Sequence, residues 1–399
     1  MSDMRDDVRE LFRALTGREV DGLWSAPGRV NLIGEHTDYN GGFVLPFAID
    51  RRTVAAVGVR DDDRIRVAST FAPDEPWIES SLPDLDAVRA AGDEGDWARY
   101  PLGIAWALGQ DVAGPRGADL RAVPGVDILI DSTVPSGAGL SSSAAIECAV
   151  AVALNDLWRL GLDRPALAKA GQRSENDFVG APTGILDQSA SMLGRRDHAV
   201  FLDCRSLQVE IVPLGFEQAG LSVLVIDTGQ AHEHANGDYR DRREACERGA
   251  RELGVVALRD VGVGDLDRAR SVLDDVTFRR VRHVVTEDAR VLETVRLLRE
   301  EGPRSIGAAL DASHASMRDD FEITTPQLDL AVETARDAGA LGARMTGGGF
   351  GGSAIALVPD ELLSQVRVAV DGAFAEHGYG QPDAFVVRPS DGATREPDA

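Results

Sequence analysis

Lysine is almost absent from this sequence of 399 residues. Lys169 is the only lysine among 42 basic residues, and the others are arginines. A P-loop needs a lysine at the end of its glycine run, and a protein kinase needs one on its third strand. Lys169 lies in the helical, alanine-rich stretch Ala-Leu-Ala-Lys-Ala and meets neither requirement. The sequence therefore excludes both of these ways of holding nucleotide phosphates.

Cysteines and long apolar segments are also scarce. Cys148, Cys204 and Cys246 lie far apart and form no pair of the metal-binding kind. Together with a charged N-terminus, they predict a reducing compartment and no secretion. No apolar run approaches the length of a membrane span, so we expect a cytoplasmic protein. His232 and His234 suggest a metal pair, but no third ligand follows at a metal spacing, and no site is expected there.

A surplus of positive charge is missing as well. The formal net charge is −24, which argues against nucleic acid and against an anionic membrane surface as partners. The length favours about two domains, and the 43% apolar content is ordinary for a globular protein. A nucleotide would have to bind through backbone N–H groups, arginines or a metal ion.

The most informative stretch runs from residue 26 to residue 42 and reads APGRVNLIGEHTDYNGG. Within ten residues it carries four side chains that can hydrogen-bond the hydroxyls of a polyhydroxylated ligand, namely Arg29, Glu35, His36 and Asp38. A tight-turn signal and an apolar run follow, so the loop lies between ordered elements, where binding residues tend to occur. The alternative is a solvated turn that happens to carry charges.

This run closely resembles the sugar-binding signature of galactokinases. These enzymes belong to the GHMP superfamily of small-molecule kinases, which also includes homoserine, mevalonate and phosphomevalonate kinases. The resemblance extends from about Leu23 to Gly392 and rests on three motifs in the expected order. The first of them is a long, nearly literal match.

The second motif is a glycine loop followed by an alanine-rich helical pattern, PSGAGLSSSA at residues 135–144. Backbone N–H groups of such a loop, with the positive end of a helix, suit phosphate. On the residues alone, an ordinary capped helix is the alternative. The loop resembles the superfamily's phosphate loop, which uses no lysine. The resemblance implies nucleotide contacts from Gly137, Ala138, Gly139, Leu140, Ser141, Ser142 and Ser143.

Two acidic residues follow, twelve positions apart. Glu175 lies in a helical pattern, and Asp187 follows a sharp turn at residues 180–184. On residues alone, a carboxylate after Pro and Gly is most often a turn or cap residue. By resemblance, Glu175 matches the family's magnesium carboxylate and Asp187 its catalytic aspartate in Gly-Ile-Met-Asp-Gln. Leu186 stands here in place of the methionine.

Three further features complete the resemblance. The segment around Tyr239 resembles the family's sugar-contacting tyrosine region. Trp97 matches a tryptophan near the adenine, although core packing is an alternative role for it. The third motif, GARMTGGGFGGS at residues 342–353, contains five glycines in six positions, which indicates a close approach of the backbone to a ligand or to another segment.

The resemblance implies the two-domain α/β (α+β) fold of GHMP kinases, with the active site between the domains. Residues 1–205 would form a ribosomal-S5-domain-2-like domain, and residues 206–399 a ferredoxin-like domain. From the residues themselves we expect a helix from Phe278 to Arg299 with its arginines and glutamates facing solvent. We also expect a surface excursion at 72–96 and a loose polar tail after Arg388.

The implied activity is ATP-dependent phosphorylation of the C1 hydroxyl of galactose, giving galactose 1-phosphate and ADP, in galactose (Leloir) metabolism. Asp187 would accept the hydroxyl proton, and Arg29 would keep it ionised and stabilise the transferring charge. Mg²⁺ would be held by Ser143 and Glu175. The sugar would be bound by Arg29, Glu35, His36, Asp38, Gly184, Asp187 and Tyr239. The alternatives are a kinase for a related sugar such as N-acetylgalactosamine, and a non-catalytic sensor of galactose and ATP. A monomer is expected.

Overall fold

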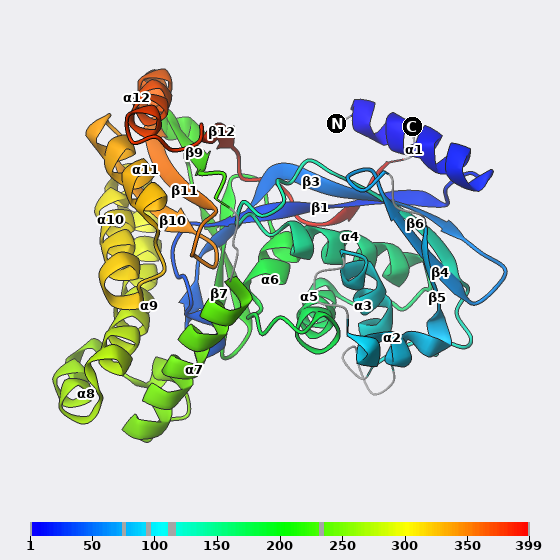
Figure 1. Cartoon of the computed structure of the whole chain (residues 1–399), viewed down its shortest axis with the longest axis horizontal. Helices are drawn as coiled ribbons and strands as arrows, with labels where there is room; N and C mark the ends of the chain where they lie inside the picture. The colour runs from blue at the N-terminus through cyan, green and yellow to red at the C-terminus, as the bar shows by residue number, and fades with distance from the viewer. Residues whose placement is uncertain (1, 74–76, 93–96, 111–116, 231–234, 398–399) are drawn as a thin grey trace.

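A computed structural model describes residues 2–73, 77–92, 97–110, 117–230 and 235–397 of the chain. Its strands form three sheets, and helices cover them in two groups that lie at opposite ends of the molecule (Figure 1). Within the described part, no helix combines the length and the apolar character that crossing a bilayer requires.

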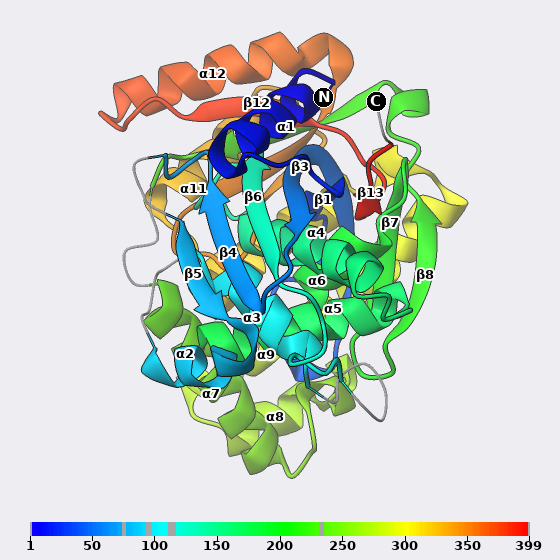
Figure 2. The same cartoon turned by 90° about the vertical axis from the view of Figure 1, so that its right-hand side faces the viewer.

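The first sheet has six strands in the order β13-β1-β3-β6-β4-β5, and β4 and β6 are its only parallel neighbours. Helix α1 lies on one face, and α3 to α6 lie on the other (Figures 1 and 2). Alanines on the buried face of α4 let the helix approach β1 and β3 closely. The strands are β1 (Gly22–Asn31), β3 (Pro46–Val59), β4 (Arg64–Ser69), β5 (Ile78–Ser81), β6 (Val126–Ser132) and β13 (Thr394–Arg395). The helices are α1 (Ser2–Thr16), α2 (Leu85–Ala91), α3 (Arg99–Leu108), α4 (Ser142–Leu157), α5 (Arg164–Arg173) and α6 (Leu186–Leu193).

The second sheet is antiparallel, with the strand order β10-β11-β9-β12. Numbered along the chain, this order is 2-3-1-4, which is the ferredoxin-like order expected for the C-terminal half. Its strands are β9 (Leu221–Asp227), β10 (Gly342–Thr346), β11 (Ser353–Pro359) and β12 (Asp383–Val387). The accompanying helices are α7 (Ala235–Leu253), α8 (Leu266–Val272), α9 (Asp275–Glu300), α10 (Gly307–Ser316), α11 (Pro326–Asp337) and α12 (Leu363–Glu376).

A small third sheet joins the two halves. It contains β2 (Phe43–Val44), β7 (His198–Asp203) and β8 (Gln208–Pro213). One apolar core cluster lies beside it and combines side chains of β1 and β3 with side chains of β9, β11 and β12. The β7–β8 hairpin spans residue 205, so the domain boundary near that position stays a prediction.

The prediction of a loose tail after Arg388 is wrong. β13 pairs with β1, and Ala393 is fully buried in the first core. The guanidinium of Arg52 donates to the carbonyl oxygens of Asp391 at 2.7 Å and Gly392 at 3.0 Å. The polar composition of the tail predicted that it would be loosely held. Its main-chain carbonyl oxygens are instead bound by the buried Arg52, which composition does not reveal.

Of the surface excursion predicted at 72–96, the structure describes residues 72–73 and 77–92, and 77–92 contain regular elements that their composition did not indicate. β5 pairs with β4, and α2 packs against α3. Two leucines in this stretch, Leu82 and Leu85, are fully buried. They anchor a segment whose prolines and acidic residues otherwise indicate a loop.

Candidate active site

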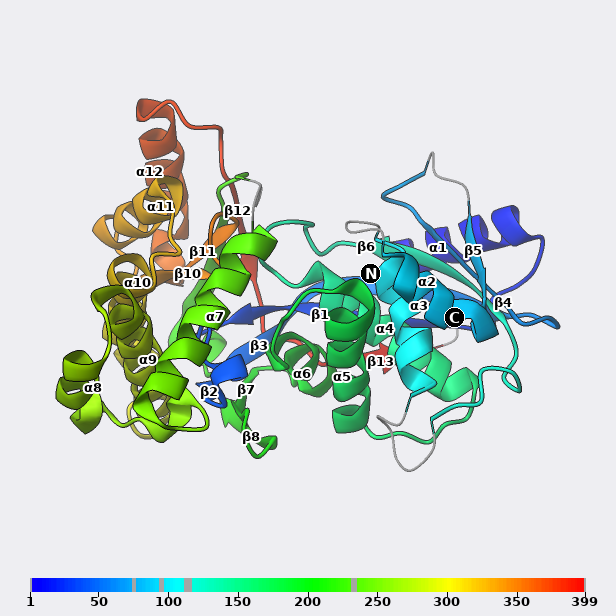
Figure 3. The same ribbon diagram turned by 60° about the horizontal axis from the view of Figure 1, so that its bottom comes forward.

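A cavity of about 180 Å³ opens where the two halves meet. It lies between the end of β1, the turn that leads into α6, helix α7 and the glycine-rich turn after β10. Helix α7 faces α5 and α6 across the middle of the molecule (Figures 1 and 3). All seven residues predicted to contact a sugar line it. The lining residues are Arg29, Glu35, His36, Asp38, Ala181, Pro182, Thr183, Gly184, Leu186, Asp187, Tyr239, Gly347 and Gly348.

Arg29 and Asp187 form a two-pronged ion pair on the cavity wall. Arg29 Nε lies 2.7 Å from Asp187 Oδ1, and Nη2 lies 2.9 Å from Oδ2. The hydroxyl of Ser141 donates to Asp187 Oδ2 at 2.5 Å. Such bidentate, charge-assisted contacts fix both side chains in direction as well as in charge. Asp187, at the start of α6, is therefore held with a carboxylate edge toward the cavity.

Arg29 also holds the phosphate-loop candidate. Its Nη1 donates to the carbonyl of Gly139 at 2.5 Å, and its backbone N–H donates to the carbonyl of Leu140 at 3.0 Å. One arginine thus connects the predicted base to the predicted phosphate loop.

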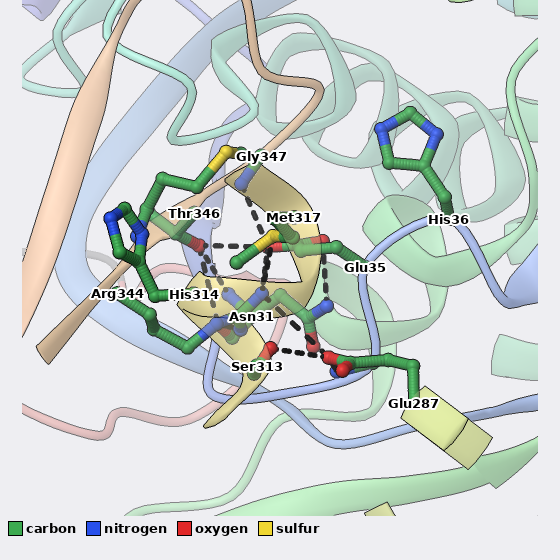
Figure 4. Close-up of polar contacts among 12 residues, drawn as sticks. Asn31, Glu35, His36, Glu287, Ser313, His314, Met317, Arg344, Thr346 and Gly347 are labelled. Atoms are coloured by element: carbon green, nitrogen blue, oxygen red, sulfur yellow. Dashed lines mark hydrogen bonds and ion pairs between the residues drawn. The ribbon is translucent and has the colours of Figure 1, made fainter. Parts of the chain in front are cut away.

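Two further carboxyl groups line the cavity, the buried Glu35 and the half-buried Asp38, and desolvation raises the pKa of each. The pKa of Asp38 rises to about 6, first from desolvation and then from the negative charge of Asp187. Glu35 is held from behind (Figure 4): Asn31 Nδ2 donates to Oε2 at 2.8 Å, and the N–H of Gly347 donates to Oε1 at 2.8 Å. The oxygens of Glu35 are thus held at fixed positions, and Asp38 Oδ1 is held by the N–H of Tyr39 at 2.9 Å.

The imidazole of His36 is neutral, because burial lowers its pKa to about 3. Nε2 lies 3.1 Å from the carbonyl of Gly348, which only accepts, so Nε2 carries the hydrogen. Nδ1 accepts from the hydroxyl of Tyr39 at 2.7 Å. Both ring nitrogens thus have protein partners, and the ring lies 5.0 Å from that of Tyr239. The predicted sugar contact of His36 stays a prediction, and the ring nitrogens would have to release a partner to make it.

Gly184 is a glycine because Asp38 occupies the space of a side chain. A Cβ at position 184 would lie 1.7 Å from Asp38 Oδ2. Any larger residue must displace the Asp38 carboxylate from the cavity wall.

We therefore expect Gly184→Ala to weaken galactose binding by about 10²-fold, because a misplacement of about 1 Å in a site has this effect. Calorimetric titration with galactose would measure it. Gly372→Ala is the matched control, since a Cβ at that position meets no atom within 4 Å. Equal galactose affinities of the Gly184→Ala variant and the unmodified chain would show that galactose binding does not depend on the position of the Asp38 carboxylate.

The predicted phosphate loop precedes α4. Gly137 and Gly139 have positive φ angles of 75° and 73°, and Ser141, the residue before the helix, has a φ of 58°. Among the described residues no side chain caps α4, because the Ser141 hydroxyl donates to Asp187 instead. Uncapped N–H groups and the positive helix end suit an anion. Ala138 and Leu140 are buried, and Ser142 and Ser143 are half-buried on the first turn.

The third glycine motif packs on this loop. A Cβ on Gly347 would lie 2.9 Å from the carbonyl oxygen of Gly139, and the Ser353 hydroxyl donates to the carbonyl of Ala138 at 2.7 Å. Its glycines therefore permit a close approach between two chain segments, one of the two reasons expected for them.

Ser143 and Glu175 form the candidate metal pair. Ser143 Oγ lies 3.3 Å from Glu175 Oε1, while Glu175 Oε2 accepts from Thr183 Oγ1 at 2.7 Å and Gln188 Nε2 at 2.8 Å. A hydroxyl and one carboxylate oxygen fit Mg²⁺, which usually takes one or two carboxylates together with substrate phosphates. In the described part of the chain, no group of three or more His, Cys, Asp or Glu residues could hold a metal ion. His232 and His234 lie outside the described residues.

Trp97 lies outside the cavity lining. Its ring is 5.3 Å from that of Phe71 and packs against the first core cluster. Its contact with adenine stays a prediction, and the packing expected as the alternative is present.

Three buried residues next to the cavity were not identified from the sequence: Gln188, Glu287 and Arg344. Gln188 Nε2 donates to Glu147 Oε2 at 2.9 Å as well as to Glu175. Burial raises the pKa of Glu147 well above its usual range, and the negative charge of Glu175 raises it further. The local signals were the adjacency of Gln188 to Asp187 and the place of Arg344 within the third glycine motif, and Glu287 had none.

Comparisons with known proteins agree with the family resemblance of the three motifs. The galactokinase galactose-binding signature matches residues 10–59, the GHMP kinase N-terminal domain matches 99–195, and the GHMP kinase C-terminal model matches 294–376. A galactokinase from Streptomyces coelicolor is 51% identical over 390 residues, which are 97% of each chain. The chain belongs to the galactokinase family. A second galactokinase, from Streptomyces lividans, is 48% identical over 380 residues, which cover 95% of this chain and 92% of that one.

Galactokinases also supply a close solved structure. The crystal structure of Lactococcus lactis galactokinase complexed with galactose matches with a TM-score of 0.91 at 32% identity and covers 98% of this chain and 100% of that one. The resemblance read from the motifs is thus confirmed, together with the two-domain α/β fold of GHMP kinases. Membership of the galactokinase family makes the protein a kinase and implies ATP as its co-substrate.

Proposed function

We propose that this kinase transfers the γ-phosphoryl group of ATP to the C1 hydroxyl of galactose and releases galactose 1-phosphate and ADP. The observation that carries the proposal is the Arg29–Asp187 pair in a cavity that all seven predicted sugar residues line. The Lactococcus lactis galactokinase, whose solved structure contains galactose, has the same fold along its whole length and supports the choice of sugar.

In this mechanism Asp187 is the general base. Its carboxylate accepts the proton of the sugar hydroxyl, and the bidentate contact with Arg29 directs one edge of it toward the substrate. Arg29 also stabilises the negative charge on the γ-phosphoryl group during its transfer, since phosphoryl transfer depends mainly on positioning and charge neutralisation. The loop 137–141 and the start of α4 would receive the ATP phosphates on their N–H groups.

The remaining sugar hydroxyls would be bound by the acceptors of Glu35 and Asp38, with Gly184, Tyr239 and His36 completing the wall. Ser143 and Glu175 would hold Mg²⁺, which supplies charge neutralisation at the phosphates when it is bound. Two alternatives, a kinase for N-acetylgalactosamine and a sensor without turnover, predict different outcomes in the substrate panel that tests this proposal.

The proposal is tested by ADP release with magnesium-ATP and a panel of galactose, glucose, galactosamine, N-acetylgalactosamine, arabinose and mevalonate. We expect turnover with galactose and little with glucose or mevalonate. Greater turnover with N-acetylgalactosamine would favour the first alternative. Tight calorimetric binding of galactose without turnover would favour the sensor.

Galactose affinity is expected to fall below pH 6. Desolvation and the charge of Asp187 raise the pKa of Asp38 to about 6, so it takes up a proton below that pH and loses an acceptor for the sugar hydroxyls. Each pH unit below the pKa then weakens binding by about tenfold. Calorimetry from pH 5 to 8 without nucleotide measures this effect. In Asp38→Asn the decline should vanish, and a decline of the same size in that variant would contradict the assignment.

Ser143→Ala should raise the Mg²⁺ concentration needed for half-maximal turnover, because the hydroxyl beside Glu175 is one of two proposed protein ligands. A Mg²⁺ titration at saturating ATP and galactose measures the shift. Glu175→Gln should act in the same direction, and the double variant should be little worse than the poorer single variant. An unchanged titration curve in Ser143→Ala would remove Ser143 from the metal site.

We further propose that the kinase works as a monomer in the cytoplasm. Cys148, Cys204 and Cys246 are unpaired, which suits a reducing compartment. Light scattering at several protein concentrations tests the monomer, and a mass near twice 42.6 kDa would overturn it.

A further inference from the structure

A fully buried arginine, Arg344, lies on β10 next to the cavity residue Glu35 (Figure 4). Its Nη2 is 3.4 Å from Glu35 Oε1 and 4.0 Å from Glu287 Oε1. Nη1 donates to the carbonyl of Asn31 at 3.1 Å. The guanidinium therefore lies between two carboxylates and is tied to the main chain at the end of β1.

Glu287 has its own balancing contacts. Arg290 Nε lies 2.7 Å from its Oε2, while the N–H of Gly34 and the hydroxyl of Ser313 donate to its Oε1 at 3.0 and 2.6 Å. The carboxylates of Glu35 and Glu287, the buried guanidinium of Arg344 and the half-buried guanidinium of Arg290 thus form a network whose formal charges cancel. Within it, Glu35 is the carboxylate that also reaches the cavity.

The same network extends to the phosphate loop. Two residues after Arg344, the hydroxyl of Thr346 lies 3.3 Å from Glu35 Oε1, and the next N–H, of Gly347, donates to that oxygen at 2.8 Å. Gly347 packs directly against Gly139. Glu35 is therefore held by the strand end whose following turn supports the phosphate loop.

We propose that Arg344 is a positioning residue of this kinase that fixes the Glu35 carboxylate against the sugar and ties its position to that of the phosphate loop. The inference rests on the proposed function, because it takes Glu35 as a sugar ligand. Arg344 does not line the cavity and acts only through its neighbours.

The charges around Glu35 give the proposal a measurable consequence. Burial raises the pKa of Glu35, and the largest opposing influence is Arg344, followed by Arg29. Burial keeps the nearby histidines neutral by lowering their pKa values, to about 3 for His36 and about 4 for His283. Without Arg344, Glu35 would become protonated at a higher pH. The charged and titratable groups around it are Arg29, His36, Asp38, His283, Glu287, Arg290 and Arg344.

The test is calorimetric titration of the full chain with galactose from pH 5 to 8.5. In Arg344→Met we expect the pH of half-maximal affinity to rise above the value of about 6 that Asp38 sets in the unmodified chain, and galactose affinity at pH 7 to fall by about tenfold or more. Arg344→Lys should lie between the two, because it keeps the charge and loses the planar fork. In the double variant Arg344→Met/Glu35→Gln the midpoint should return to that of the unmodified chain, although affinity stays low.

Arg52→Met is the matched control, since Arg52 is a buried arginine that bonds main-chain carbonyls of the C-terminal segment and does not line the cavity. Arg52→Met should lower the melting temperature and leave the pH of half-maximal galactose affinity unchanged. An unshifted midpoint and affinity in Arg344→Met, or the same shift in Arg52→Met, would overturn the inference. If Arg344→Met does not fold, unaltered affinity and midpoint in Arg344→Lys would overturn it. Absence of galactose binding by the unmodified chain would instead overturn the proposed function.

Discussion

Asp187→Asn is expected to lower kcat by about 10²- to 10⁴-fold while galactose still binds. An amide keeps the shape of the carboxylate and can accept one hydrogen bond from Arg29, but it cannot take the hydroxyl proton. Single-turnover ADP formation, together with calorimetric titration of galactose, measures both effects. Turnover close to that of the unmodified chain would exclude Asp187 as the base.

The same substitution has two further consequences that separate loss of the base from collapse of the site. Arg29 is buried and would lose its counter-charge, so the melting temperature should fall. The charge of Asp187 also raises the pKa of Asp38, so the decline of galactose affinity should begin at a lower pH in Asp187→Asn. Ser141→Ala removes a hydrogen bond to Asp187 and leaves the charge, and it should not shift this decline.

The first two motifs could be read from the sequence because their functional residues are close neighbours along the chain. Arg29, Glu35 and Asp38 lie within ten positions, and the loop around them is fixed by its own glycines. Asp187 and Glu175 were recognised by motif and spacing. The structure brings all of them to one cavity, although nothing in their local sequence states that β1 and α6 meet.

The buried network was missed for the opposite reason. Glu287 lies on α9 in a segment rich in arginine and glutamate, and such residues normally face solvent, as Glu293 does. Its partners Gly34 and Arg344 are more than fifty positions away in each direction. Burial of a charge depends on distant partners, which composition and periodicity do not record. The prediction of a loose tail was wrong for the same reason. Arg52 is more than three hundred positions away in the sequence from the carbonyls of Asp391 and Gly392 that it binds.

Arg29→Lys is the other substitution with a large expected effect, a fall in kcat of about 10²- to 10³-fold, because a charged group that neutralises a transition state typically contributes this much. Lysine keeps the positive charge, but its single ammonium cannot hold both oxygens of Asp187 and the carbonyl of Gly139 at once.

The phosphate loop should also loosen in this variant, because Arg29 Nη1 is one of the groups that holds it. KM for ATP should therefore rise more than the dissociation constant for galactose. Steady-state kinetics with each substrate varied, and calorimetry with galactose, distinguish the two. Arg52→Lys is the control for replacing a buried arginine, and it should affect melting temperature without changing kcat. If Arg29→Lys retained its kcat and raised only the galactose dissociation constant, Arg29 would be a sugar ligand and not the link between base and phosphate loop.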